Sequence, residues 1–283
     1  MIRNLKINQS PPLVGSVILS GAKNAALRHL AASLLTSERV ILTQYPAALL
    51  DAQIHVEMLN ILGKSTKTTN DKIIIDEKFS PVTTLNWSGR SIRNTLLILG
   101  ALTARQGAGR VPLPGGCKLG DRKYDLHVMI LEKMGARVWD KGGFLCAEAM
   151  TGGLIGTDIY LPIRSTGATE NAILCATLAK GITRIWNPHI RPEIIDLIVI
   201  LRKMGAQIRV FGQEHIEVRG VEGLHGVEHH VIADSMEAVT WLVGAVMTKG
   251  DVEIKGFPFD DLEVVLAHLK AAGAKLYRND DAL

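Results

Sequence analysis

The 283-residue chain is long enough for about two domains of roughly 150 residues each, and its 47% hydrophobic and 21% charged residues exclude an intrinsically disordered protein. Its 32 basic and 28 acidic residues give a formal net charge of +4, and only 5% of residues are aromatic, which disfavours a base-stacking nucleic-acid surface. No apolar run resembles a signal peptide or approaches the roughly 20 residues of a membrane span. We therefore expect a soluble, cytoplasmic protein that binds neither nucleic acid nor membranes.

The first predicted element is a strand over residues 13–19 with a turn at Gly15, followed by a helix that opens in Ser20-Gly21-Ala22-Lys23-Asn24-Ala25-Ala26-Leu27. Small side chains let a ligand approach the backbone, and a helix N-terminus offers unpaired N–H groups, to which Lys23 adds a full charge. The spacing is not that of a P-loop. The segment is a candidate phosphate or carboxylate site, although a tight turn with a solvated lysine explains the local sequence at least as well.

Amphipathic helices that end at a glycine recur along the chain, with the glycines 68 to 72 residues apart at Gly63, Gly135, Gly205 and Gly273. Glycine enters the left-handed region without a Cβ clash and so commonly ends a helix. The last three glycines are followed by alanine and then by a predicted strand, at residues 137–139, 207–209 and 275–277. A repeating helix–strand unit is therefore expected.

A second feature recurs with the same period. Apolar helices are predicted to end near Leu35, Leu102, Leu178 and Val246, each followed by a turn and a strand. Each unit therefore carries strand, helix, strand, helix and closing strands, which predicts an α/β (α+β) architecture. Glycine-alanine after a helix is common in any such protein, but two features at one matched period favour a true repeat.

The boundaries of the repeats predict two domains. A boundary near residues 20–22 and another near 230 would enclose a three-repeat domain over 22–231. Residues 1–21 and 232–283 would then form a second, partial domain with one repeat. The histidines near the second boundary, His225, His229 and His230, have no cysteine or carboxylate at ligand spacing, and we interpret them as a polar loop.

Two further segments favour anion binding. Arg90 and Arg93 precede an apolar helix, where a basic side chain opposes the helix dipole unless an anion is bound. The segment Arg164-Ser165-Thr166-Gly167-Ala168-Thr169 leads a strand into a helix through small hydroxylated residues and is a second candidate phosphate site. An ordinary Ser/Thr helix cap explains this second segment equally well.

The three cysteines form neither a disulfide framework nor a zinc-ligand pattern. Cys146 and Cys175 stand among apolar neighbours and are expected in the core. Cys117 follows Pro114-Gly115-Gly116 in an exposed loop, and the nearby basic side chains would favour its thiolate. Beyond it, Asp125 and His127 stand where the next helix is predicted to begin.

Together these segments resemble the enolpyruvyl transferase family. The matching pieces follow the family order over nearly the whole chain: Ser20-Gly21-Ala22-Lys23-Asn24-Ala25-Ala26-Leu27, Leu113-Pro114-Gly115-Gly116-Cys117, Asp125-Leu126-His127, Ser165-Thr166-Gly167-Ala168-Thr169-Glu170-Asn171 and Pro192-Glu193-Ile194. The combination of Gly-Ala-Lys-Asn-Ala with Pro-Gly-Gly-Cys is the most specific part of this resemblance.

The resemblance implies an inside-out α/β barrel fold, built from βαβαββ repeats in two domains, the second incomplete. It also implies an activity: transfer of the enolpyruvyl group of phosphoenolpyruvate to the 3-hydroxyl of UDP-N-acetylglucosamine, with release of phosphate, in peptidoglycan precursor synthesis. No metal or organic cofactor is implied.

The resemblance also implies roles for individual residues. Lys23 and Asn24 would hold phosphoenolpyruvate with Arg122, and Cys117 would donate the proton and be the target of the epoxide antibiotic fosfomycin. The residues expected to bind the sugar nucleotide are Arg93, Arg122, Lys123, Tyr124, Asp125, Leu126, Arg164, Ser165, Thr166 and Gly167.

The chain departs from the family pattern in its length and at several positions, among them Lys123, which stands where the family usually has proline. The lysine usual in the diphosphate strand is Ile163 here, with Arg164 as a substitute. The family has six repeats and the chain has four, and the missing two would carry the aspartate that deprotonates the sugar hydroxyl. A non-catalytic relative that binds a sugar nucleotide is therefore the alternative, as is a chain that needs a protein partner or self-association to cover the incomplete domain.

Overall fold

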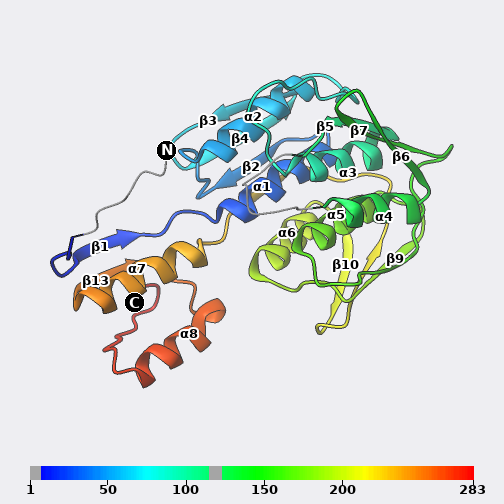
Figure 1. Ribbon diagram of the computed structural model, residues 1–283. Coiled ribbons are helices and arrows are strands. Elements are labelled where there is room, and N and C mark those ends of the chain that lie inside the picture. The colour runs from blue at the N-terminus through cyan, green and yellow to red at the C-terminus, as the bar shows by residue number, and fades with distance from the viewer. Residues whose placement is uncertain (1–7, 115–122) are drawn as a thin grey trace. The chain divides into compact units, whose positions relative to one another are not determined.

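A computed structural model describes residues 8–114 and 123–283, and the chain divides into two compact units (Figure 1). The larger unit is Lys23–Ile232. The smaller unit combines Met1–Ala22 with Ala233–Leu283. Cys117 and Arg122, the predicted proton donor and its neighbouring cation, lie outside the described residues.

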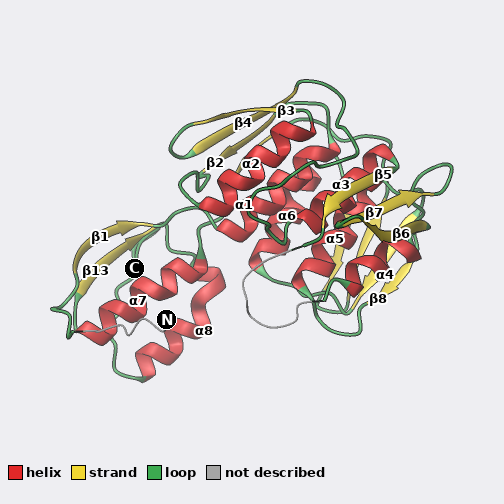
Figure 2. Cartoon of the chain, turned by 45° about the horizontal axis from the view of Figure 1, so that its top comes forward, coloured by secondary structure: helices red, strands yellow, loops and turns green. Residues whose placement is uncertain are grey.

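The larger unit has its helices inside and its sheets outside, as the inside-out prediction required (Figure 2). Its helices are α1 (Lys23–Ala32), which continues into a short 3₁₀ helix η1 (Ser33–Leu35), α2 (Leu50–Leu62), α3 (Thr95–Gln106), α4 (Asp125–Lys133), α5 (Thr166–Thr177) and α6 (Pro192–Lys203). Residues 95–103 of α3 and 168–177 of α5 are buried on every side, which is typical of a helix in the centre of a core. Gly100 lets these two helices approach, because a Cβ there would overlap the Asn171 amide.

Three sheets cover this helical core, and each has an antiparallel part made by one repeat. The first has the order β12 (Val227–His230), β2 (Val40–Thr43), β4 (Lys72–Glu77), β3 (Lys64–Thr68). The second has β5 (Ala108–Pro112), β7 (Phe144–Ala149), β6 (Ala136–Lys141), and the third β10 (Gln207–Phe211), β11 (His215–Arg219), β9 (Ile182–Trp186), β8 (Asp158–Tyr160). Strand β12 pairs in parallel with β2, so the end of the third repeat completes the sheet of the first.

The glycine pattern is confirmed in all four repeats. Gly63, Gly135, Gly205 and Gly273 have φ values of 115°, 86°, 103° and 94°, so each uses the left-handed conformation that ends a helix. Strands β3, β6 and β10 follow the first three glycines, and each pairs with the next strand along the chain. The strand predicted at residues 275–277 is wrong, because no strand of the described chain pairs with that segment.

The smaller unit pairs strands from the two ends of the chain. Strand β1 (Val14–Ile18), which was predicted at 13–19, lies parallel to β13 (Asp251–Lys255). Helices α7 (Ser235–Thr248) and α8 (Phe259–Ala271) cover them around a core that includes Leu19, Leu242 and Phe257. The same unit exposes Val14, Ile18, Met247, Val264 and Tyr277.

Within residues 8–114 and 123–283, no helix combines the length and the apolar character that a membrane span requires.

Candidate functional site

The larger unit contains a cavity of about 890 Å³ at which its helices begin. Each of α1 to α6 contributes a residue from its first turn or its N-cap: Lys23, Asp51, Asn94, Asp125, Thr166 and Glu193. Unpaired backbone N–H groups and the helix dipoles give a helix N-terminus a positive partial charge. Six such ends at one cavity make it a favourable environment for an anion.

Helix α1 directs four side chains at the cavity, Lys23, Asn24, Leu27 and Arg28. They are one helical turn apart in pairs and so share a face of the helix. The Lys23 ammonium lies 3.2 Å from the Asp51 carboxylate at the start of α2, and both side chains keep partial exposure. The first turn of α1 carries no acidic residue, so no carboxylate of that turn offsets the positive end of the helix dipole beside Lys23.

The segment before α3 is held to two other parts of the lining. The Asn94 side-chain amide donates to the Leu27 carbonyl at 2.8 Å, which fixes the start of α3 against α1. The Arg93 guanidinium donates to the Lys123 carbonyl at 2.5 Å, just before α4. These bonds place Arg90, Arg93 and Lys123 at the same side of the cavity.

His127 on α4 is an uncharged wall of the cavity. Its side chain is 5% exposed, and burial, with a smaller contribution from Arg93, lowers its pKa to about 3. Its Nε2 lies against Gly167 on α5, where an added Cβ would come within 3.3 Å of that nitrogen. A glycine at 167 therefore leaves room for His127 and brings the N-terminus of α5 close to α4.

A buried carboxylate lies deeper in the cavity, on α5. Glu170 is fully buried, and its carboxylate is 2.8 Å from the Arg28 guanidinium. Burial raises the pKa of Glu170, while Arg28 opposes the rise. A second ion pair joins Arg191 and Glu193 at 3.4 Å. Two acidic side chains of the lining, Glu170 and Glu193, are thus each paired with a basic one.

The whole lining has more basic than acidic side chains. The basic ones in the described chain are Lys23, Arg28, Arg90, Arg93, Lys123 and Arg191, and the acidic ones are Asp51, Asp125, Glu170 and Glu193. With His127 neutral and six helix N-termini added, the cavity suits a ligand with several negative charges.

Most of the predicted site residues that the structure describes meet at this cavity: Lys23, Asn24, Arg93, Lys123, Asp125, Leu126, Ser165, Thr166 and Gly167. Two do not line it. The Tyr124 hydroxyl donates to the Asp140 carboxylate at 2.9 Å, and the Arg164 guanidinium donates to Asn187 and Gln213 side-chain oxygens at 3.2 Å. Local polar partners therefore hold both side chains elsewhere, and Ile163, not Arg164, faces the cavity.

Sequence reasoning missed Arg28, Asp51, Glu170 and Arg191 as members of the lining. Arg28 follows Asn24 by one helical turn, so the helical spacing was a usable signal. Glu170 likewise follows Thr166 by one turn of α5. Asp51 and Arg191 had no such signal, because separate helices bring them to the cavity. The interpretation of His229 as part of a polar loop is also wrong: it lies on β12, is buried, and its ring bonds to Asp196 at 2.8 Å. Cys146 and Cys175 are buried as expected.

Comparison with known proteins shows which family the chain matches. The family described as EPSP synthase (3-phosphoshikimate 1-carboxyvinyltransferase) matches residues 7–283. The chain is 39% identical, over 98% of its length, to UDP-N-acetylglucosamine 1-carboxyvinyltransferase of Shewanella amazonensis. It is 41% identical, over 95% of its length, to UDP-N-acetylglucosamine 1-carboxyvinyltransferase 2 of Carboxydothermus hydrogenoformans. The chain spans 66% and 64% of these relatives, or about two thirds of their length.

Solved structures show the same fold. The enolpyruvyl transferase NikO from Streptomyces tendae superposes with a TM-score of 0.81 at 22% identity, covering 98% of the chain and 66% of NikO. An EPSP synthase from Acinetobacter baumannii gives a TM-score of 0.76 at 23% identity, covering 94% of the chain and 61% of that protein.

Proposed function

Because the chain belongs to the EPSP synthase family of enolpyruvyl transferases, we propose that it transfers the enolpyruvyl group of phosphoenolpyruvate to the 3-hydroxyl of UDP-N-acetylglucosamine. In this reaction the methylene carbon of phosphoenolpyruvate gains a proton, and the sugar 3-hydroxyl loses its proton as its oxygen bonds to the central carbon. The phosphate C–O bond of the adduct then breaks as a proton leaves the new methyl group. The products are the enolpyruvyl ether and phosphate, a step of peptidoglycan precursor synthesis.

The observation that carries this proposal is the convergence of six helix N-termini and six basic side chains on one cavity. Phosphoenolpyruvate brings a phosphate and a carboxylate, and the sugar nucleotide brings a diphosphate. Anions of this kind gain most from charge-assisted hydrogen bonds in a site that excludes water. The names of the relatives at about 40% identity supply the choice of these two substrates.

We assign phosphoenolpyruvate to the α1 side of the cavity. Lys23 and Asn24 stand there with the N–H groups of the first turn of α1. Arg122 and Cys117 lie outside the described residues, so their roles as added cation and proton donor depend on the family motif alone. Arg93 and Lys123 line the neighbouring wall, where we place the uridine end of the sugar nucleotide with Asp125 and Leu126.

We assign the diphosphate to the N-terminus of α5. Ser165 caps this helix by accepting from the Ala168 N–H at 3.3 Å, and Thr166 and Gly167 line the cavity beside it. Arg164 is left out of this group, because its guanidinium is bound to Asn187 and Gln213. The backbone of the α5 N-terminus would therefore supply the contacts that the sequence alone assigned to an arginine.

Phosphate release from phosphoenolpyruvate in the presence of UDP-N-acetylglucosamine tests the proposal, with the affinity for each substrate measured by calorimetry. Turnover that requires both substrates supports it. Binding of the sugar nucleotide without turnover would refute activity of this chain alone and favour the second candidate, a relative that binds a sugar nucleotide or needs a partner. Loss of both binding and turnover would contradict the substrate assignment itself.

A further inference from the structure

Three side chains from distant parts of the sequence meet in the core of the larger unit. They are His29 on α1, Asp196 on α6 and His229 on β12, and their exposed fractions are 0%, 4% and 3%. The Nε2 of His229 lies 2.8 Å from one carboxylate oxygen of Asp196, and the Nε2 of His29 lies 3.2 Å from the other. One ligand atom from each residue falls within 4.8 Å of the other two.

The hydrogen bonding of this cluster is incomplete. Both ring nitrogens of His29 and the Oδ2 of Asp196 are buried without a hydrogen-bond partner among residues 8–114 and 123–283, although Nε2 and Oδ2 lie 3.2 Å apart. A buried polar atom left in this state destabilises the fold and calls for an explanation. In a four-coordinate zinc site with bonds of about 2.0–2.1 Å, neighbouring ligand atoms lie about 3.3 Å apart. The two nitrogen–oxygen separations here are 2.8 and 3.2 Å, and the three ligand atoms lie within 4.8 Å of one another, so the two rings would move slightly toward a bound ion.

We propose that His29, Asp196 and His229 form a buried binding site for Zn²⁺ or a similar divalent transition-metal ion. Two imidazole nitrogens and one carboxylate oxygen are a ligand set that such ions prefer. The ion would satisfy the unpaired atoms of His29 and Asp196 and would join α1, α6 and β12. Because α1 also carries Lys23 and Arg28 into the cavity, the site would stabilise the helix that holds them.

The charge states of the cluster suit this role. Burial lowers the pKa of His29, against the opposing effect of Asp196, so its ring is neutral and keeps a lone pair at neutral pH. Burial alone would raise the pKa of Asp196, but the bond from His229 and the nearby His29 ring, 3.2 Å away, outweigh it and lower that pKa. The carboxylate is therefore ionised, as a metal ligand must be.

Lys203 provides an internal test, because its hydrogen bond to His229 competes with metal binding by that ring. Its ammonium lies 3.3 Å from the Nδ1 of His229. When Lys203 donates to Nδ1, the ring proton is on Nε2 and points at Asp196. A metal ion on Nε2 requires that proton to move to Nδ1, and the exposed Lys203 side chain must then turn away. Removing the lysine charge should thus tighten metal binding, whereas it would weaken a purely hydrogen-bonded cluster.

The experiment uses the 283-residue chain after removal of metals with a chelator. Zn²⁺ is titrated by calorimetry, and Co²⁺ is used as a spectroscopic probe, since its visible absorption distinguishes a four-coordinate nitrogen–oxygen site from the hydrated ion. We expect one equivalent per chain and a rise in the melting temperature. His29→Gln should weaken binding at least about tenfold, as even the loss of an outer partner does at metal sites.

His230→Gln is the matched control, because His230 is the next residue, is exposed and bonds to Thr43 rather than to Asp196. It should leave the affinity unchanged, while Lys203→Gln should tighten binding a few-fold. Absence of stoichiometric binding to the chelator-treated chain would overturn the proposal. So would binding that survives His29→Gln but is lost in His230→Gln. If His29→Gln does not fold, unchanged or weaker binding by Lys203→Gln contradicts the site on its own.

Discussion

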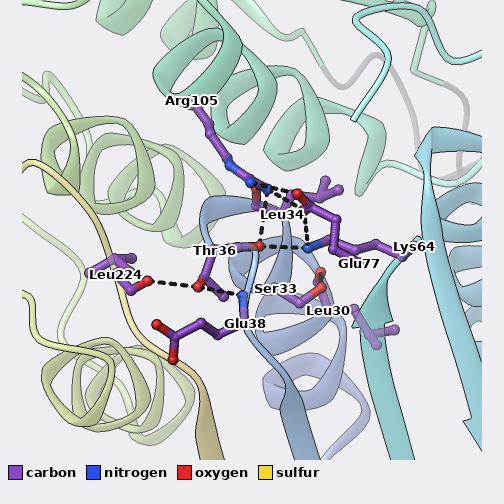
Figure 3. A network of polar contacts seen from close by, with 9 residues as sticks. All are labelled: Leu30, Ser33, Leu34, Thr36, Glu38, Lys64, Glu77, Arg105 and Leu224. Atoms are coloured by element: carbon purple, nitrogen blue, oxygen red, sulfur yellow. Dashed lines mark hydrogen bonds and ion pairs between the residues drawn. The ribbon is translucent and has the colours of Figure 1, made fainter. Parts of the chain in front are cut away.

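The charged residues found near the two ends of helix α1 differ in their arrangement. At its N-terminus, Lys23 and Arg28 face a cavity in which basic side chains outnumber acidic ones. At its C-terminus, where η1 leads into Thr36, Glu77 lies between Lys64 and Arg105 at 2.9 and 2.6 Å (Figure 3). Both cations also donate to the Thr36 carbonyl. The charges of this second group, the Thr36 network, are satisfied within the protein.

The cavity cations Lys23 and Arg28 also have carboxylate partners, Asp51 and Glu170, but Lys23 keeps 41% of its side chain exposed, whereas Lys64 in the network keeps 1%. In the Thr36 network each cation meets a carboxylate and a backbone carbonyl, so no further anion is needed. At the cavity basic side chains outnumber acidic ones, and the helix N-termini add positive partial charge, although Asp51, Asp125 and Glu193 stand in the first turns of α2, α4 and α6. Substitutions in the network should therefore change stability, and those at the cavity should change ligand binding.

The largest expected effect is on stability, from Glu77→Gln. This change leaves Lys64, which is almost fully buried, and Arg105 without their shared carboxylate. Breaking a buried ion pair from one side costs about 3 kcal/mol or somewhat more. Urea denaturation should show a loss of about 3 kcal/mol in the free energy of unfolding, with substrate affinity of the folded fraction unchanged.

Asp76→Asn is the control for this prediction. Asp76 is the preceding residue and pairs with Arg39 at 2.7 Å, but both side chains are well exposed to solvent. Its loss should leave the free energy of unfolding nearly unchanged, because solvent screens such pairs. Equal effects of the two substitutions would show that the Thr36 network does not hold the fold as the distances indicate.

As the pH falls, the contribution of His127 at the cavity to the free energy of unfolding should be lost before that of Glu77 in the Thr36 network. The pKa of His127 falls from 6.5 to about 3 on folding, mainly through burial. The unfolded chain therefore takes up this proton first, and stability is lost as pH falls from about 6.5 toward 3, by up to roughly 1.4 kcal/mol per pH unit. Glu77 behaves differently: burial raises its pKa, but Arg105 and Lys64 outweigh this and lower it. Its contribution is lost only below the pKa of an unfolded glutamate.

Chemical denaturation between pH 6.5 and 5 checks this order. His127→Gln should reduce the dependence of the unfolding free energy on pH in that window by up to about 1.4 kcal/mol per pH unit, leaving the dependence due to His29 and His55, whose pKa values burial also lowers. Glu77→Gln should leave the slope as in the unaltered chain. A wild-type slope that is already flat there would mean that His127 takes up its proton in the folded state, against the burial that the structure shows.

The repeat could be predicted from the sequence because its signals are local. A glycine that ends a helix acts through its own φ angle, and Gly63, Gly135, Gly205 and Gly273 all adopt the predicted conformation. Whether residues 275–277 form a strand could not be predicted from such a local signal. A strand needs a partner across space, and the partners of β3, β6 and β10 are hairpin neighbours that this segment lacks in the described chain.

The candidate site was predictable where one helix end carries the chemistry. Lys23 and Asn24 stand at a strand-to-helix turn, and their position follows from that turn alone. Glu170 pairs with Arg28 of another helix, and His229 pairs with Asp196, 33 residues earlier. Such pairs depend on how the helices pack, so no spacing in the sequence reveals them.

A smaller effect is expected on ligand binding, from Lys23→Gln. The ammonium of Lys23 is the cation at the N-terminus of α1, and a hydrogen bond to a charged group contributes about 1.5–3 kcal/mol. The affinity for phosphoenolpyruvate should therefore fall about 30-fold, corresponding to about 2 kcal/mol, while the melting temperature stays close to that of the unaltered chain. Calorimetry with Lys67→Gln, an exposed lysine on β3, provides the control. A large loss of stability in Lys23→Gln would show that this lysine stabilises the fold, as the residues of the Thr36 network do, and would contradict a role in ligand binding alone.

The smallest effect is expected from Arg164→Ala, and it tests where the sequence pattern and the structure disagree. The pattern assigned Arg164 to the diphosphate, whereas its guanidinium donates to Asn187 and Gln213 and does not line the cavity. The affinity for UDP-N-acetylglucosamine should change less than about twofold, since an exposed side chain outside the site contributes little. Arg93→Gln, which alters a lining residue, should weaken the same binding about tenfold or more through the loss of a charged hydrogen bond. A loss of similar size in Arg164→Ala would mean that the arginine leaves Asn187 and Gln213 when the nucleotide binds. Arg164 would then belong with the ligand-binding charges and not with the structural ones.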